Sequence, residues 1–408
     1  GLQLAADPLM ARDREEELGP GLLRALPEEV GASTDHLAPL LHRAMTDSAW
    51  PGGVLLAAKD GRIFAHEAFG YHTYARRKPT TRGDIFDLAS ITKVVATTSA
   101  VMKLYDEGRI DLDASLATYL PRFRGPDAVQ TRLKSEVTIR QVLYHGSGLP
   151  AWKAYYREAD SADDMLEGIY ATPLDTLPGT RALYSGVGLM LLGELVEAVS
   201  GETLDAYVKR QVFDPLGMGS TYFNPPAARL ARIVPTEYSE TEGSFVRGHV
   251  HDENAHTLGG VAGNAGLFST AANLAIFAQM MLNLGAYRDS LIFLPETVEL
   301  FTRRANAIPE SARCLGWDSP EGEASAGIYA DPSSFGHTGF TGTSLWIDPS
   351  NRLFVILLTN AVHPHRAGKD PHYYDWRQRI HSAVYESFPA PQRNPEVQLK
   401  PRWAAGSH

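Results

Sequence analysis

The chain has 408 residues, and 44% of them are hydrophobic. This chain is too long to fold around one ordinary hydrophobic core, so its length favours two domains or one large domain with an insertion. Its formal net charge of −10, without a clustered run of lysine or arginine, argues against nucleic acid as a partner. The one cysteine, Cys314, excludes internal disulfides and a cysteine-based zinc cage, and we interpret it as a packed free thiol.

In chain order, residues 1–34 form a polar, proline-bearing lead-in segment. Residues 36–46 follow helix-start signals and predict an amphipathic helix. The apolar runs 53–58 and 62–69 are joined by Lys59-Asp60-Gly61, which is hairpin turn chemistry, so they predict two antiparallel strands. A long, strongly apolar helix is then predicted from Ser90 to the stop signal at Glu107-Gly108.

Helical patterns with Pro and Gly punctuation follow at residues 138–144, 162–169, 187–199, 204–213 and 271–284. Near residue 315 the pattern changes again. Runs 343–347 and 353–359 predict a second hairpin, and residues 374–387 predict a closing helix.

Strands at both ends with helices between them predict an α+β fold rather than alternating βαβ units. We expect an antiparallel sheet built from both termini and flanked by helices, with a mostly helical inserted domain. The sheet domain would comprise residues 35–85 and 315–390, the helical domain residues 86–314, and a C-terminal tail residues 391–408.

Ser90 and Lys93 stand three residues apart at the start of the long helix, so their side chains share one face. A lysine held neutral by burial and positive surroundings can take the proton of a serine hydroxyl and make it nucleophilic. Ser-x-x-Lys is a catalytic signature. By itself the pair is equally compatible with a helix-start serine and a solvated lysine.

Two further stretches carry candidate chemistry. Tyr184, in the turn before the 187–199 helix, could relay a proton, or it could be a half-buried packing residue. Gly336-His337-Thr338-Gly339-Phe340 precedes the 343–347 strand, and small residues there let a ligand approach the backbone. A backbone N–H of this segment and that of Ser90 could form an oxyanion hole, although a Gly-rich strand entry is also ordinary turn chemistry.

Together and in this order, the three stretches resemble the motifs of the serine β-lactamase and penicillin-binding-protein superfamily. The likeness covers about residues 35–388 and is closest to class C β-lactamases, D-Ala-D-Ala carboxypeptidase-type serine hydrolases and family VIII carboxylesterases. Further stretches that match this superfamily lie at residues 138–150, 213–218 and 259–270.

The resemblance implies a role for each matching residue. Ser90 would be the acylated nucleophile, Lys93 its general base and Tyr184 the proton relay. The backbone N–H groups of Ser90 and Phe340 would form the oxyanion hole. His337, Thr338 and Gly339 would be the substrate-binding strand, with the cleft between the sheet and the helical region.

This sequence departs from the family motifs at two positions. Gly186, which the resemblance places among the substrate-binding residues, replaces the asparagine of Tyr-x-Asn, whose amide would contact the substrate. His337 replaces the lysine of Lys-Thr-Gly, exchanging a permanent charge for one expected to titrate near neutrality, which weakens capture of a substrate carboxylate. Both changes favour an ester substrate without an obligatory carboxylate.

Other readings of the sequence are weaker. Histidines 249, 251 and 256, and histidines 363, 365 and 372, show no recognised metal spacing, so structural or solvated histidines are favoured over a metal site. The glycines at 260, 263 and 266 indicate close backbone packing near the cleft rather than a phosphate cradle. No Gly-x-Ser-x-Gly occurs, which removes the α/β-hydrolase route to an esterase.

The sequence therefore predicts a cofactor-independent serine hydrolase that forms an acyl-enzyme, above all a carboxylesterase on small or medium esters. Alternatives are a D-amino-acid peptidase or amidase, a weak β-lactamase or an acyltransferase, and, in another class, an inactive ligand-binding protein. The partner would be a small acyl substrate. No run approaches the roughly 20 apolar residues of a membrane span, so a soluble protein is expected. The compartment stays open, because a signal peptide could have been removed. The sequence does not give the oligomeric state.

Overall fold

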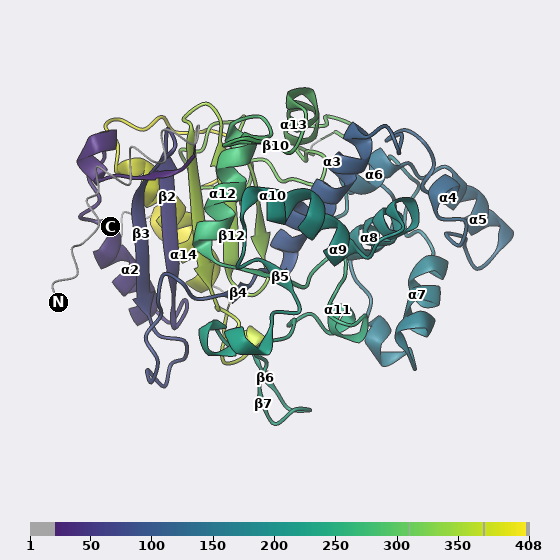
Figure 1. Ribbon diagram of the computed structural model, residues 1–408, viewed down its shortest axis with the longest axis horizontal. Coiled ribbons are helices and arrows are strands. Elements are labelled where there is room, and N and C mark those ends of the chain that lie inside the picture. The colour runs from purple at the N-terminus through teal and green to yellow at the C-terminus, as the bar shows by residue number, and fades with distance from the viewer. Residues whose placement is uncertain (1–20, 310, 370–371, 405–408) are drawn as a thin grey trace.

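The computed structural model describes residues 21–309, 311–369 and 372–404 (Figure 1). Most of the lead-in segment lies outside these residues. Within the described chain the fold is α+β, as the sequence predicted, and strands from both ends of the chain lie side by side in one sheet (Figure 1). The proposed domain boundaries stay a prediction.

The main sheet has six strands in the order β1-β3-β2-β13-β12-β11. Every neighbouring pair is antiparallel except β1 with β3. The strands are β1 (Leu23–Arg24), β2 (Gly52–Lys59), β3 (Arg62–Gly70), β11 (Phe335–Gly339), β12 (Thr343–Asp348) and β13 (Leu353–Thr359). Both predicted hairpins are confirmed, with Asp60 and Gly61 at positive φ in the first turn.

Helices cover both faces of this sheet. Along β2, Val54 and Leu56 point into one core with α12 (Ala271–Leu282), while Leu55 and Ala57 point into a second core with two other helices. These are α2 (Leu37–Thr46) and α14 (His372–Glu386). Burial on both faces explains why β2 is a continuous apolar run rather than an alternating one.

The segment after Ser90 is not one continuous α-helix. A 3₁₀ turn, η2 (Ala89–Ile91), leads into a π-helix, η3 (Lys93–Thr98), and only then into α3 (Ser99–Asp106). Four of the six π-helical residues are β-branched, which crowds the preceding turn and lowers α-helix propensity. π-Helical turns of this kind are frequent at functional sites.

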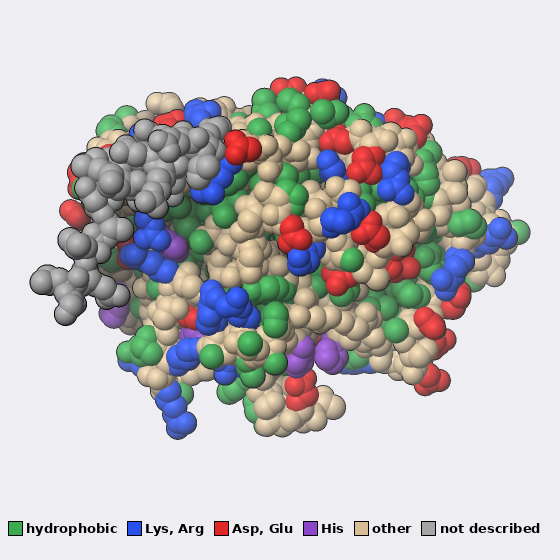
Figure 2. Space-filling view, viewed as in Figure 1, with side chains coloured by type: hydrophobic (Ala, Val, Ile, Leu, Met, Phe, Trp, Pro, Cys, Tyr) green, Lys and Arg blue, Asp and Glu red, His purple; other side chains and the backbone are tan. Residues whose placement is uncertain are grey.

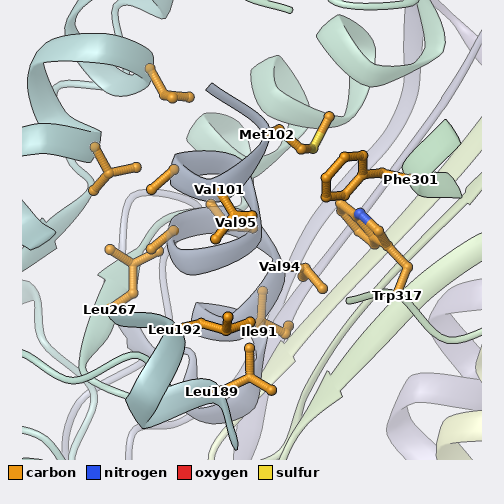
Figure 3. Close-up of a cluster of buried hydrophobic side chains, with 14 of the residues drawn as sticks. Ile91, Val94, Val95, Val101, Met102, Leu189, Leu192, Leu267, Phe301 and Trp317 are labelled. Carbon is orange, nitrogen blue, oxygen red and sulfur yellow. The ribbon is translucent and has the colours of Figure 1, made fainter. Parts of the chain in front are cut away.

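The π-helix and α3 run through the centre of the larger core (Figure 3). Side chains of this segment pack against α8 (Gly186–Ser200), the strand β8 (Leu267–Ser269) and the helix α13 (Pro295–Thr302). Figure 3 labels ten buried side chains of this cluster: Ile91, Val94, Val95, Val101, Met102, Leu189, Leu192, Leu267, Phe301 and Trp317. This packing keeps the first turn of the π-helix away from water.

The remaining elements are shorter helices, helical turns and minor strands. The helices are α4 (Leu116–Tyr119), α5 (Ala128–Ser135), α6 (Ile139–Leu143), α7 (Ala162–Ala171), α9 (Leu204–Val208), α10 (Asp214–Leu216), α11 (Glu253–Thr257) and α15 (Pro401–Ala404). A second π-helix, η5 (Lys209–Phe213), joins α9 to α10, and short 3₁₀ turns are η1 (Pro27–Val30), η4 (Tyr155–Arg157), η6 (Ala227–Arg232) and η7 (Arg366–Gly368). Minor strands are β4 (Phe86–Asp87), β5 (Tyr222–Phe223), β6 (Tyr238–Ser239), β7 (Ser244–Phe245), β9 (Ala286–Tyr287) and β10 (Ser290–Leu291).

Acidic and basic side chains are interspersed over the helical part of the face shown in Figure 2, rather than gathered into a basic stripe. Among the described helices, none combines the length and apolar character needed to cross a bilayer.

Candidate active site

A cleft of about 270 Å³ opens between the end of β11 and the helical region. Ser90 and Tyr184 line it, together with all four residues from His337 to Phe340. The structure therefore brings the three sequence-predicted stretches to one site. β11 is the edge strand of the sheet, so its last residues are free to face this cleft.

Ser90 and Lys93 contact each other directly. Lys93 Nζ lies 2.8 Å from Ser90 Oγ and also donates to the backbone oxygen of Asn264 at 2.9 Å. Side chains at i and i+3 eclipse in a 3₁₀ turn, which is the geometry over residues 89–91. The Lys93 side chain is 3% exposed, so this contact is shielded from water.

The residues 87–93, which we call the nucleophile turn, are held mainly through their backbone. The carboxylate of Asp87 accepts the N–H of Ala89 at 2.8 Å and the N–H of His251 at 2.7 Å. Burial raises the pKa of Asp87, while these two hydrogen bonds lower it. Ala89 has φ of +47°, a left-handed conformation that is rare outside glycine and asparagine. The Asp87 hydrogen bond holds this strained residue directly before Ser90.

The loop after β11 also holds the nucleophile turn. Thr341 Oγ1 donates to the backbone oxygen of Asp87 at 2.7 Å, and Thr343 Oγ1 donates to that of Leu88 at 3.0 Å. A Cβ on Gly339 would overlap the Leu88 carbonyl oxygen. We expected the lack of a side chain at Gly339 to let a ligand approach the backbone. In the structure it is Leu88, in the nucleophile turn, that lies against the backbone of Gly339.

Four nitrogen-bearing side chains lie near the aromatic ring of Tyr184. Lys93 Nζ is 5.1 Å and Arg313 Cζ is 5.2 Å from the centre of its ring. The ring of His145 lies 4.8 Å away and that of His337 5.8 Å away, centre to centre. The hydroxyl forms no hydrogen bond with Ser90 or Lys93 in the described chain, so its relay role stays a prediction.

His145 holds the loop that carries Tyr184, a role that the sequence analysis missed. Its backbone oxygen accepts the N–H of Leu183 at 2.8 Å, and its Nδ1 accepts the N–H of Ser185 at 3.0 Å. Burial, with a smaller effect of nearby cations, keeps the pKa of His145 well below its ordinary value. The imidazole is therefore neutral, and Nδ1 stays an acceptor at ordinary pH.

His337 does not titrate near neutrality, contrary to the expectation from the sequence. It is almost fully buried, and this burial lowers its pKa to about 4, against the opposing charge of Asp318. Its Nδ1 donates to the backbone oxygen of Thr338 at 2.8 Å, and its Nε2 is buried without a hydrogen-bond partner in the described chain. A neutral imidazole thus occupies the first position of the predicted substrate-binding strand.

The other predicted binding residues fall into two groups. Thr338 and Phe340 line the cleft, and Lys369 Nζ donates to the Phe340 backbone oxygen at 2.9 Å. Gly186 does not line it, because it is buried as the first residue of α8 and donates to the Ala151 oxygen at 2.8 Å. The oxyanion hole from the Ser90 and Phe340 N–H groups stays a prediction.

The Gly-rich stretch behind the cleft supports Lys93. A Cβ on Gly263 would overlap the carbonyl oxygen of Leu189 in α8, which confirms close backbone packing there. The Gly263 oxygen accepts Thr97 Oγ1 at 2.7 Å, and the next residue, Asn264, accepts Lys93. The glycine spacing signalled the packing but not the lysine contact.

One wall of the cleft was not identified from the sequence. We call Arg313, Asp318 and Arg377 the substrate wall. Arg313 donates to Asp318, while Arg377 projects from α14. Arg313 and Asp318 come from the segment before β11 and Arg377 from α14, and neither segment carries a recognisable motif.

The histidine clusters make ordinary polar contacts. His251 Nε2 lies 2.8 Å from Glu237, and His249 Nε2 lies 3.1 Å from Glu242. Across the described chain, no group of three His, Cys, Asp or Glu side chains is placed to hold a metal ion. Cys314 is a buried free thiol, and burial raises its pKa to about 12.

Comparison with known proteins agrees with this architecture. The family model described as Beta-lactamase matches residues 37–379. The chain is 34% identical to the "Putative D-alanyl-D-alanine carboxypeptidase" of Escherichia coli strain K12 over 386 residues, covering 86% of this chain and 88% of that protein. It is 36% identical to the N-acetylmuramyl-L-alanine amidase of Bacillus subtilis strain 168 over 351 residues, covering 78% of each.

Solved structures share the fold at lower sequence identity. A family VIII carboxylesterase superposes with a TM-score of 0.67 at 22% identity, covering 87% of this chain and 97% of that chain. EstCE1, a hydrolase with promiscuous acyltransferase activity, has a TM-score of 0.69 at 21% identity, covering 85% and 97%.

The fold and the site together define a serine hydrolase. The chain belongs to the beta-lactamase family, within the superfamily of β-lactamases and penicillin-binding proteins.

Proposed function

We propose that this protein is a carboxylesterase that hydrolyses small or medium esters through an acyl-enzyme on Ser90. One observation carries the proposal: Ser90 Oγ lies on the wall of the cleft with the buried Lys93 Nζ only 2.8 Å away. A general base has to stand within about 2.6–3.2 Å of the proton that it takes, and this pair meets that requirement.

In the proposed reaction, Ser90 Oγ attacks the ester carbonyl while its proton passes to Lys93. The tetrahedral intermediate collapses, the C–O bond to the alcohol breaks, and the alcohol leaves with that proton, by way of Tyr184. Water then attacks the acyl-enzyme by the reverse proton path, releasing the acid and the free serine. The N–H groups of Ser90 and Phe340 would stabilise the oxyanion.

Two features favour an ester over an amide. Gly186 offers no side-chain amide to the substrate, and His337 is neutral rather than cationic at pH 7. An alcohol is also a better leaving group than an amine, so ester cleavage depends less on a well-placed proton donor. This suits a site in which the Tyr184 hydroxyl makes no hydrogen bond to Ser90 or Lys93 among the described residues.

Amide hydrolysis is the second candidate, because the relatives at 34–36% identity bear carboxypeptidase and amidase names. Matched substrates separate the two functions. We expect p-nitrophenyl acetate and butyrate to give a burst followed by turnover, and kcat/KM for an ester to exceed that for the corresponding p-nitroanilide. A higher value for D-alanyl p-nitroanilide would establish the amidase instead, and faster turnover of nitrocefin would establish a β-lactamase.

Labelling tests the nucleophile. A fluorophosphonate should add to Ser90, as located by mass spectrometry, and Ser90→Ala should abolish both the adduct and turnover. Ser135→Ala, which removes an exposed serine on α5, is the matched control and should behave as wild type. If folded wild-type protein accepts no acyl donor and no fluorophosphonate, the proposal is wrong.

A further inference from the structure

Phe340 exposes an aromatic ring inside the Ser90 cleft. It is 45% exposed, and among the described residues it is the one exposed large hydrophobic side chain that lines this cleft. Arg313, Asp318 and Thr338 also line the cleft, so the ring is an apolar surface among polar side chains. A single exposed aromatic residue is ordinary elsewhere on a protein, but this ring lies where a substrate has to bind.

A lysine covers one face of the Phe340 ring. Lys369 Nζ lies 3.4 Å from the ring centre and also donates to the backbone oxygen of Phe340 at 2.9 Å. Lys369 is buried, and its Nζ lies 5.6 Å and 5.3 Å from the ring centres of Tyr373 and Tyr374. Three aromatic rings therefore hold the cation, and the cation in turn holds both the main chain and the ring of Phe340.

A second contact fixes the place of this ring relative to the nucleophile. The imidazole of His251 stacks on the Phe340 ring, with 5.9 Å between the ring centres and 26° between the planes. His251 Nε2 lies 2.8 Å from Glu237, and the backbone N–H of His251 donates to the carboxylate of Asp87 at 2.7 Å. Because Asp87 belongs to the nucleophile turn, these contacts connect the Phe340 ring to the turn that carries Ser90.

A ring held in this way can contact a substrate at little entropic cost, because its side chain is already ordered before binding. Covering the exposed part of the ring with an apolar group of the substrate releases water and is favourable. The backbone N–H of Phe340 is also the predicted donor to the oxyanion. A group that covers the ring therefore has to lie close to the scissile bond.

The lysine on the ring face favours an aromatic group over a saturated one. An aromatic ring has a negative face and a positive edge, and the charge of Lys369 draws the π-electrons of Phe340 toward the covered face. The edge of Phe340 then becomes more positive and attracts the negative face of a second ring, which a saturated ring lacks. Arg366 Cζ lies 5.9 Å from the same ring centre, so a cationic group of a substrate would be repelled here.

We propose that Phe340 is a specificity-determining residue whose ring contacts an aromatic group of the substrate next to the scissile bond. This proposal rests on the proposed function and names its substrate class: esters that carry an aromatic ring a few bonds from the ester group. The position of the ring beside the predicted oxyanion donor is compatible with an aromatic group on the acyl side or on the alcohol side, so both sides are tested.

Two matched pairs of esters differ only in whether a six-membered ring is aromatic or saturated. For the acyl side, methyl 3-phenylpropanoate is compared with methyl 3-cyclohexylpropanoate. For the alcohol side, benzyl acetate is compared with cyclohexylmethyl acetate. We expect wild-type kcat/KM to favour the aromatic member of at least one pair by about 2- to 12-fold, as a contact between two aromatic rings allows. A ratio below about 2 in both pairs would overturn the proposal.

Variants at position 340 locate the preference. Phe340→Leu keeps the backbone N–H and an apolar side chain but removes the ring, so the ratio for the preferred pair should fall to about 1. Phe340→Tyr keeps the ring and should keep the preference. Phe245→Leu, which removes an exposed phenylalanine of β7 that does not line the cleft, is the matched control and should leave the ratio unchanged. Equal losses of kcat/KM on both esters in Phe340→Leu would leave the ratio unchanged and overturn the proposal.

Binding to Ser90→Ala gives a readout that needs no turnover. In NMR titrations, this variant should bind N-benzylacetamide or 3-phenylpropanamide more tightly than the corresponding cyclohexyl compound. Adding Phe340→Leu should remove the difference, and Phe340→Tyr should retain it. If no ester is hydrolysed but this difference is present and depends on the ring at position 340, the carboxylesterase proposal fails while the aromatic contact stands. If esters are hydrolysed and neither rate nor binding favours the aromatic compound, the Phe340 proposal fails alone.

Discussion

The nucleophile turn and the substrate wall face the same cleft but are built in opposite ways. The turn lies within seven consecutive residues and is fixed by hydrogen bonds to its own backbone, from Asp87, Thr341 and Thr343. The wall consists of side chains from two segments: Arg313 pairs with Asp318 before β11, and Arg377 projects from α14. Changes in the turn should therefore affect every substrate, whereas changes in the wall should alter the preference among substrates.

Loss of the amine in the turn should have the largest effect. Lys93→Ala removes the group 2.8 Å from Ser90 Oγ, so we expect acylation to slow by about 100- to 10,000-fold on every ester. Burst kinetics with p-nitrophenyl butyrate measure this rate. Lys209→Ala, which removes an exposed lysine paired with Asp214, should change it little. Near-normal acylation by Lys93→Ala would show that another group takes the Ser90 proton.

Displacing the turn without removing a functional group should have the next largest effect. The methyl group of Gly339→Ala would overlap the Leu88 oxygen and push the turn away from β11, and a shift of about 1 Å can cost roughly 100-fold in rate. The loss should be the same for p-nitrophenyl acetate and p-nitrophenyl butyrate. Gly219→Ala, at a glycine with no atom within 4 Å of the added Cβ, is the control. A loss confined to one ester would contradict the division between turn and wall.

Acid should lower the stability of the fold through His337, which lies on β11. The pKa of His337 is about 4 when folded and near its ordinary value of 6.5 when unfolded, so the unfolded chain binds more protons between these values. The free energy of unfolding should therefore fall as pH drops from 6.5 to 4, by up to about 3 kcal/mol from His337. Urea unfolding at several pH values measures this. His337→Asn should lessen the dependence, and an unchanged dependence would show that His337 is not kept neutral by the fold.

The smallest effect is expected in the wall. Asp318→Asn removes the charge paired with Arg313, and both side chains are about one-quarter exposed, so the pair contributes at most about 1 kcal/mol. We expect kcat/KM to change about fivefold or less, and in opposite directions for the anionic 4-nitrophenyl hydrogen glutarate and the neutral 4-nitrophenyl valerate, because Arg313 then lacks its paired negative charge. Steady-state kinetics on these two esters would show this. A large loss of kcat/KM that is equal for both esters would show that Asp318, like the nucleophile turn, affects every substrate.

The sequence was sufficient for the features that are local in the chain. Turn residues such as Asp60 and Gly61 predicted the hairpins, and the spacing of Ser90 and Lys93 predicted their contact. The role of His145 and the place of Arg377 beside the cleft could not be found this way, because both depend on which distant residues surround them.

The charge of His337 was misjudged for the same reason. The ordinary pKa of an imidazole is a property of the residue, whereas its burial is a property of the fold. The π-helix over Lys93–Thr98, in place of the start of the predicted α-helix, was also missed, since hydrophobic periodicity does not distinguish the two kinds of helix over six residues.

The close packing of Gly263 against α8 supports the two residues to which we assign proton transfer, Lys93 and Tyr184. Asn264, which holds Lys93, follows Gly263, and Tyr184 immediately precedes the cap of α8. A displacement of this helix would therefore shift Lys93 and Tyr184 together relative to Ser90. Directed evolution can vary the substrate wall one residue at a time, but a side chain at position 263 would misalign both groups at once, so we expect libraries at this position to yield few active variants.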